Sequence, residues 1–142
     1  MSAGGFSVSV AGIVIDNENV LIIQRADNGA WEPPGGVLER GETYAQGVQR
    51  EVFEETGLTV DVHGLSGVYL NMRQHIVALV FRCTVAAGQA KTTPETMALE
   101  WVPGDEAYQR MAPAFGIRVT DALQPPGEPA VRYHDGIDLL ED

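Results

Sequence analysis

The sequence is poor in cysteine, in basic residues and in long apolar runs. Its 142 residues include one cysteine, Cys83, so no disulfide can form within the chain. Cys83 lies in the apolar run 76–84 and no obvious base is placed beside it, which favours a buried thiol over a reactive nucleophile. A chain without disulfides suits a reducing cytoplasm.

The chain also shows no targeting or membrane-spanning signal. Segment 1–12 lacks the basic region and the long apolar stretch of a signal peptide. No apolar run approaches the roughly 20 residues that a helix needs to cross a bilayer. We therefore expect a cytoplasmic protein with no membrane partner.

Positive charge is scarce. Nine Lys and Arg residues against 20 Asp and Glu residues give a formal net charge of -11. Such an excess of negative charge argues against broad binding to nucleic acid. If the substrate carries phosphate, local positive charge must come from elsewhere, and a bound divalent cation would supply it.

The length fits one domain with a sizeable core. Hydrophobic patterning predicts strands at 6–15, 20–23, 58–62, 65–70, 76–85 and 99–102, and helices at 44–56, 105–111 and 114–123. Strands on either side of a central helix indicate a layered α/β domain. We expect one domain over residues 1–142, with a core at about 6–123 and a C-terminal tail at 124–142 that either packs or frays.

The helix expected at 44–56 has signals at both ends. Thr43 is placed to cap its N-terminus, with Gln46 three residues later as in a capping box. Gly57 is placed to end it in the left-handed conformation. Gly47 costs about 1 kcal/mol relative to alanine inside a helix, a local misfit that a close contact with the helix backbone would explain.

This helix carries an unusual group of carboxylates. Glu51, Glu54 and Glu55 fall within one sector of about 100°, apart from the apolar stripe of the same helix. A cation bound among these carboxylates would offset their mutual repulsion. Hard oxygen ligands of this kind suit Mg²⁺ or Mn²⁺. Arg50 is four residues before Glu54 and can orient it. The alternative for any acidic helix face is simple solvation.

The segment Gly36 to Leu58 resembles the Nudix box. Every fixed position of that pattern is filled, by Gly36, Glu42, Arg50, Glu51, Val52, Glu54, Glu55, Gly57 and Leu58. The similarity extends upstream to Trp31, Pro34 and Gly35 and downstream to Glu95, Glu100, Trp101 and Val102, and in all it covers most of residues 6–123.

The resemblance implies an α/β/α sandwich with a mixed sheet and a metal-dependent hydrolase. Members of the family split a diphosphate bond in a nucleoside diphosphate linked to another group. The resemblance makes the metal ligands Glu51, Glu54, Glu55 and the backbone carbonyl of Gly35, and it makes Arg50 the residue that orients the glutamates. The general base is Glu54 or Glu95, with Glu100 as the next candidate.

Four further residues are candidates for substrate binding: Arg25, Trp31, Tyr69 and Arg73. Arg25 ends a strand where MutT-like relatives place a phosphate-contacting arginine, whose planar fork suits phosphate. Trp31 either stacks on a base or packs on the core. Tyr69 and Arg73, with Met72, are expected in a loop that could touch substrate, although packing or exposure would equally explain them.

The Nudix box indicates cleavage of a diphosphate bond but says little about which group leaves. A MutT-like nucleoside triphosphate pyrophosphohydrolase is the leading expectation, and an ADP-ribose or nucleotide-sugar pyrophosphatase is the alternative. The rival of another class is a non-catalytic nucleotide sensor. Retention of all the box glutamates favours an enzyme acting on a small nucleotide, and the family resemblance adds a homodimer as a possible assembly.

Overall fold

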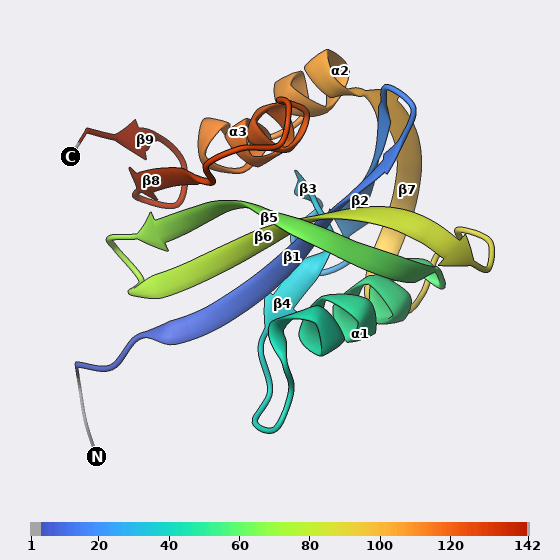
Figure 1. Ribbon diagram of the computed structural model, residues 1–142, viewed down its shortest axis with the longest axis horizontal. Coiled ribbons are helices and arrows are strands. Elements are labelled where there is room, and N and C mark those ends of the chain that lie inside the picture. The colour runs from blue at the N-terminus through green and yellow to red at the C-terminus, as the bar shows by residue number, and fades with distance from the viewer. Residues whose placement is uncertain (1–3, 142) are drawn as a thin grey trace.

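A curled, mixed β-sheet lies between helices on its two faces. The computed structural model describes residues 4–141 and shows α1 (Tyr44–Thr56) on one face and α2 (Gly104–Gln109) with α3 (Pro113–Ala122) on the other (Figure 1). The expected single-domain α/β/α sandwich is therefore confirmed. Within the same residues no helix is long and apolar enough to span a membrane.

Nine strands form the sheet in the described chain. They are β1 (Ser7–Asp16), β2 (Asn19–Arg25), β3 (Trp31–Glu32), β4 (Gly35–Val37), β5 (Thr59–Asn71), β6 (Ile76–Ala87), β7 (Thr96–Pro103), β8 (Ala130–His134) and β9 (Leu139–Leu140). The order is β3-β2-β1-β6-β5-β8-β9, with β4 paired to β1 and β7 paired to β2. The β1–β6 and β5–β8 pairs are parallel and the other pairs are antiparallel, so the sheet is mixed as expected.

The two faces of the sheet bury separate apolar clusters. Alternation along a strand sends neighbouring side chains to opposite faces. In β1, Val10 packs in the cluster that includes Val48 and Val52 of α1. Its neighbour Ala11 packs in the cluster that includes Val119 of α3. The helices on both faces are therefore fixed to the sheet by side chains from the same strands.

Helix α1 has the end signals that the sequence predicts. The Thr43 side chain accepts a hydrogen bond from the Gln46 amide, and the Gln46 side chain accepts one from the Thr43 amide. Gly57 ends the helix in the left-handed region at φ 77°. A Cβ at Gly47 would lie 2.6 Å from Leu38 Cδ1, and this close approach explains a glycine inside the helix.

Two predictions for the segment after α1 are wrong. The strands expected at 58–62 and 65–70 are one strand, β5, whose register shifts between Val62 and Leu65 and between Leu65 and Gly67. Tyr69 lies in this strand rather than in a loop. A Cβ at Gly67 would collide with the Tyr69 ring, so the glycine makes room for this side chain within the strand.

The C-terminal segment packs against the domain. Strand β8 runs parallel to β5, with His134 opposite Asn71, and β9 then pairs with β8. His134 is buried, with 2% of its surface exposed. The segment after the breaker at 124–129 therefore extends the sheet that carries the core, rather than fraying from it.

Candidate active site

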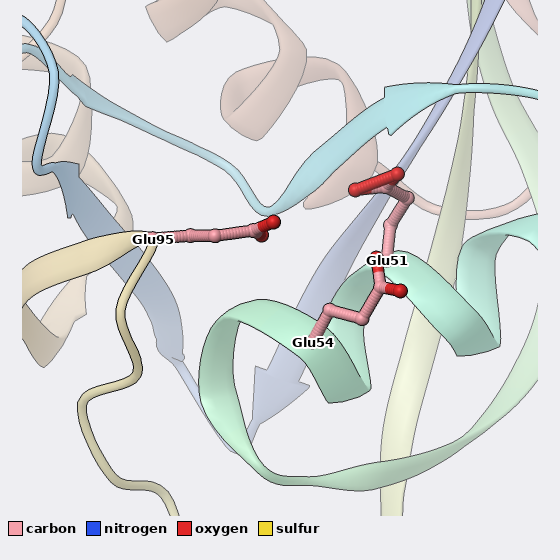
Figure 2. A group of neighbouring side chains, drawn as sticks. All are labelled: Glu51, Glu54 and Glu95. Carbon is pink, nitrogen blue, oxygen red and sulfur yellow. The ribbon is translucent and has the colours of Figure 1, made fainter.

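Helix α1 and the segment before β7 bring three carboxylates together. One carboxylate oxygen of each of Glu51, Glu54 and Glu95 lies within 4.8 Å of the other two (Figure 2). Two of the glutamates come from one face of α1, and Glu95 approaches from the chain segment on the opposite side. Oxygen ligands at this density fit a hard divalent cation such as Mg²⁺.

Glu55 lies on the buried side of this carboxylate cluster. Its side chain is 7% exposed, and its Oε1 accepts a hydrogen bond from the Gly35 amide at 3.2 Å. Burial, reinforced by the neighbouring Glu51, raises the pKa of Glu55 to about 9. Without a cation, burial and the neighbouring carboxylate therefore disfavour the ionised form of Glu55. A cation bound among the carboxylates would favour that ionised form.

Arg50 links the glutamates to one another. Its Nη1 donates to Glu51 Oε2 at 2.8 Å and to Glu54 Oε1 at 3.1 Å. Its Nη2 donates to Glu42 Oε1 at 3.0 Å and to the Val37 carbonyl at 3.1 Å. Hydrogen bonding from Arg50 holds the pKa of Glu42 below its usual range. Arg50 therefore occupies the position that its predicted orienting role requires.

Two cavities adjoin this region and share a boundary. The acidic cavity, of about 470 Å³, is lined by Glu55, Pro94 and Glu95 among others. The inner cavity, of about 230 Å³, is lined by Ala78, Phe115, Arg118 and His134 among others. Arg25, Glu32, Gly35 and Gly36 line both. A ligand whose charged part lies in the acidic cavity can therefore extend into the inner one.

Arg25 stands at the boundary with two acidic partners. Its Nε and Nη2 donate to Asp27 at 2.8 and 2.6 Å, and its Nη1 donates to Glu32 at 3.1 Å. These contacts raise the pKa of Arg25 and fix the direction of its guanidinium. The position is compatible with the predicted phosphate contact, and that role stays a prediction.

Other residues predicted to touch substrate lie elsewhere. The Tyr69 side chain is fully buried and its hydroxyl donates to Asp121 at 2.6 Å, so the structure gives this residue a place in the core. Trp31 packs against the core cluster, with the Arg110 guanidinium 4.3 Å from its ring centroid. Arg73 is exposed in the turn after β5 and is not among the residues that line either cavity.

The alternative base, Glu100, is also displaced from the cluster. It forms an ion pair with Arg110 at 2.7 Å and is not part of the carboxylate cluster found within residues 4–141. The carbonyl of Gly35, predicted as a metal ligand, belongs to β4 at the boundary of both cavities, and its ligand role stays a prediction.

Sequence reasoning missed Arg118 and His134 as lining residues. A signal for Arg118 exists in the sequence, because it lies three residues after Phe115 on the helix face expected to be buried. His134 had no such signal, because its place depends on the pairing of β8 with β5 across the whole sheet.

Comparison with known proteins agrees with this geometry. Residues 5–123 match the family model of the NUDIX domain. A MutT-like protein from Streptomyces ambofaciens is 53% identical over 135 residues, which cover 94% of this chain and 87% of that protein. An ADP-ribose pyrophosphatase from Methanocaldococcus jannaschii is 36% identical over 102 residues, covering 67% of this chain and 60% of that protein.

Solved structures give the same answer for the fold. A NUDIX hydrolase from Nitrosomonas europaea superposes with a TM-score of 0.80 at 22% identity, covering 93% of this chain and 81% of that one. Fold and carboxylate cluster together define a hydrolase. The chain belongs to the Nudix family, and it is an enzyme of the Nudix hydrolase type.

Proposed function

We propose that the protein hydrolyses a diphosphate bond in a nucleoside diphosphate linked to another group, with Mg²⁺ or Mn²⁺ as cofactor. The observation that carries the proposal is the convergence of Glu51, Glu54 and Glu95 beside the acidic cavity. Glu55 completes the ligand set on the buried side. A divalent cation bound there would neutralise diphosphate oxygens and lower the pKa of a bound water.

The chain's own residues have separable tasks in this reaction. Arg50 holds the carboxylates of Glu51 and Glu54 in one orientation. Glu54 or Glu95 accepts the proton of the attacking water at a carboxylate oxygen, and both lie in the cluster. Arg25, at the boundary of the two cavities, binds the phosphate nearest the inner cavity.

The proposed substrate class is a nucleoside triphosphate, cleaved to a monophosphate and pyrophosphate. Similarity to the MutT-like protein over 94% of the chain supports this choice. ADP-ribose or a nucleotide sugar is the second candidate, supported by the similarity to the ADP-ribose pyrophosphatase.

The test is hydrolysis by the purified protein of nucleoside triphosphates, oxidised nucleotides, ADP-ribose and nucleotide sugars with Mg²⁺ or Mn²⁺. Products are separated by chromatography, and parallel reactions contain excess EDTA. We expect metal-dependent cleavage of one class, which also identifies the leaving group. Tight, metal-dependent binding without any cleavage would instead favour a nucleotide sensor.

We further propose that the protein works in the cytoplasm, with a homodimer as the assembly to test. The buried, unpaired thiol of Cys83 is compatible with a reducing compartment. Light scattering coupled to size-exclusion chromatography would distinguish a dimer from a 15.3 kDa monomer.

A further inference from the structure

Arg118 is a buried arginine without an ion pair. Its side chain belongs to α3, and 7% of the residue's surface is exposed. Arg25, Arg50, Arg110 and Arg132 each pair with carboxylates, whereas none of the ion pairs between described residues includes Arg118. Its Nε is buried and has no hydrogen-bond partner in residues 4–141.

Two rings lie against the guanidinium, and the negative charge of Glu32, on the wall of the same cavity, also favours its charged form. It lies 4.5 Å from the centroid of Phe115 and 5.0 Å from that of Tyr69. Its Nη2 lies 3.4 Å from His134 Nε2. Burial lowers the pKa of Arg118 to about 10, so the group is charged at neutral pH. Cation–π contacts favour the charge but leave the Nε donor without an acceptor among the described residues.

Burying a charged donor group without an acceptor is costly, and removal of such a charge often stabilises a protein. A chain with 20 acidic residues has ample means to pair Arg118. The charge is instead placed on the wall of a cavity. An acceptor supplied by a ligand would offset the cost each time the ligand binds.

The cavity that Arg118 lines has both apolar and polar walls. Ala11, Ile76, Ala78 and Phe115 give it an apolar surface against which a planar ring can pack. Ser9, Glu32, Asn71 and Gln74 add polar groups to the lining. The inner cavity also shares Arg25, Gly35 and Gly36 with the acidic cavity, so a substrate can reach both.

We propose that Arg118 is a specificity-determining residue, which selects a substrate whose ring, lodged in the inner cavity, presents a ring carbonyl to the guanidinium. The proposal rests on the proposed function, because it concerns the part of the same substrate beyond the diphosphate. Arginine donates only, so it binds the carbonyl oxygen at position 6 of a purine together with the N7 acceptor, and it is not matched by an amino group at position 6.

Inosine and adenosine monophosphates test this choice directly. Their six-membered rings differ at position 6, where the first carries a carbonyl and the second an amino group. Calorimetric titration of the wild-type protein in EDTA measures both affinities without turnover. We expect the inosine compound to bind about fivefold to a hundredfold more tightly, the range given by one bidentate arginine contact.

Two variants connect the preference to Arg118. Arg118→Met keeps the length and apolar contacts of the side chain but removes its donors, so the two affinities should become equal within about twofold. Arg82→Met is the matched control, because Arg82 donates to the Ala122 carbonyl and does not line the cavity. The control should keep the wild-type preference.

Several results would overturn the proposal. They are equal affinities in the wild type, a preference for the adenosine compound, no binding of either, or a preference that survives Arg118→Met. Ribose 5-phosphate that binds as tightly as the inosine compound, through Arg118, would show an anion-binding site instead. The wild-type comparison needs no variant, so misfolding of Arg118→Met, detected by a thermal melt, leaves the test intact.

The result is separable from the proposed function. If the protein shows the Arg118-dependent preference but cleaves no diphosphate, the role of Arg118 is supported and the proposed hydrolysis is contradicted. If the protein cleaves inosine and adenosine triphosphates with equal kcat/KM and binds both monophosphates equally, the proposed hydrolysis is supported. The proposed role of Arg118 is then contradicted.

Discussion

Arg50 donates two hydrogen bonds to the carboxylate of Glu42, from Nε at 2.5 Å and from Nη2 at 3.0 Å. Glu42 lies before α1, while the other partners of this arginine, Glu51 and Glu54, lie on the helix. One guanidinium therefore couples the loop before the helix to the carboxylates on it. Lysine has no planar group that can donate several hydrogen bonds in fixed directions.

Arg50→Lys should weaken metal binding while the protein stays folded. A single ammonium cannot hold the three carboxylates at once, and loss of a group that orients ligands typically costs about 10–100-fold in metal affinity or activity. Titration of Mn²⁺, followed by electron paramagnetic resonance, measures the affinity. Arg110→Lys is the control, because Arg110 pairs with Glu100 and Glu106 outside the cluster. Equal Mn²⁺ affinities in the two variants would contradict the orienting role.

Glu54→Gln should nearly abolish turnover. The change keeps the shape of a partly exposed side chain but removes a proposed metal ligand and candidate base, and we expect kcat to fall about 10²–10⁴-fold with little change in melting temperature. Glu106→Gln is matched to it, since Glu106 is similarly exposed and pairs with an arginine four residues away. Near-normal kcat in folded Glu54→Gln would remove this residue from the machinery.

Gly36→Ala should damage the metal site without unfolding the protein. A Cβ at this position would lie 2.6 Å from the carboxylate atoms of Glu51, so the flexible end of that side chain has to move. We expect at least about a tenfold rise in the Mg²⁺ concentration for half-maximal activity, in line with the effect of displacing ligand-orienting groups. Gly64→Ala, where the nearest side-chain atom is 3.9 Å away, should leave the Mg²⁺ dependence unchanged. Activation curves that coincide for both variants would show that Glu51 does not need its present position.

His134 should make the protein less stable in acid. Burial and the nearby charge of Arg118 lower its pKa to about 4, against about 6.5 in the unfolded chain. The unfolded state therefore takes up a proton first, and stability that is complete above pH 6.5 is lost as the pH falls towards 4. The loss is on the order of 2 kcal/mol between pH 7 and pH 5 and about 3 kcal/mol once the pH has fallen below 4.

Urea denaturation at pH 7 and pH 5 measures this effect. Other groups also titrate in this range, so the informative quantity is the difference between wild type and His134→Gln. The variant should lose less free energy of unfolding than the wild type between the two pH values. His63→Gln, at a position that faces solvent, should behave as the wild type does. A pH dependence that His134→Gln leaves intact would rule out His134 as its source.

The local parts of the fold could be predicted from the sequence. Thr43, Gln46 and Gly57 act within a few residues of themselves, so the ends of α1 follow from short-range hydrogen bonding. The convergence of Glu51 and Glu54 likewise follows from helical spacing. Glu95 joins them through tertiary structure, and its place was expected only because of the family resemblance.

The parts that could not be predicted depend on long-range pairing. Two strands were expected at 58–62 and 65–70, and Tyr69 was expected in a loop, whereas pairing with β6 on one side and β8 on the other holds β5 as one strand. The inner cavity could not be foreseen for the same reason. It combines residues from β1, β6, α3 and β8, which the sequence separates by more than a hundred positions.

Strand β8 has a consequence for the choice of substrate. Its His134 lines the inner cavity, yet it lies beyond residues 5–123, which the family model matches. The proposed metal ligands therefore lie within the matched segment, whereas part of the inner-cavity wall lies after it. If the inner cavity holds part of the substrate as proposed, substitutions after residue 123 should change the preferred compound and leave the proposed metal ligands in place.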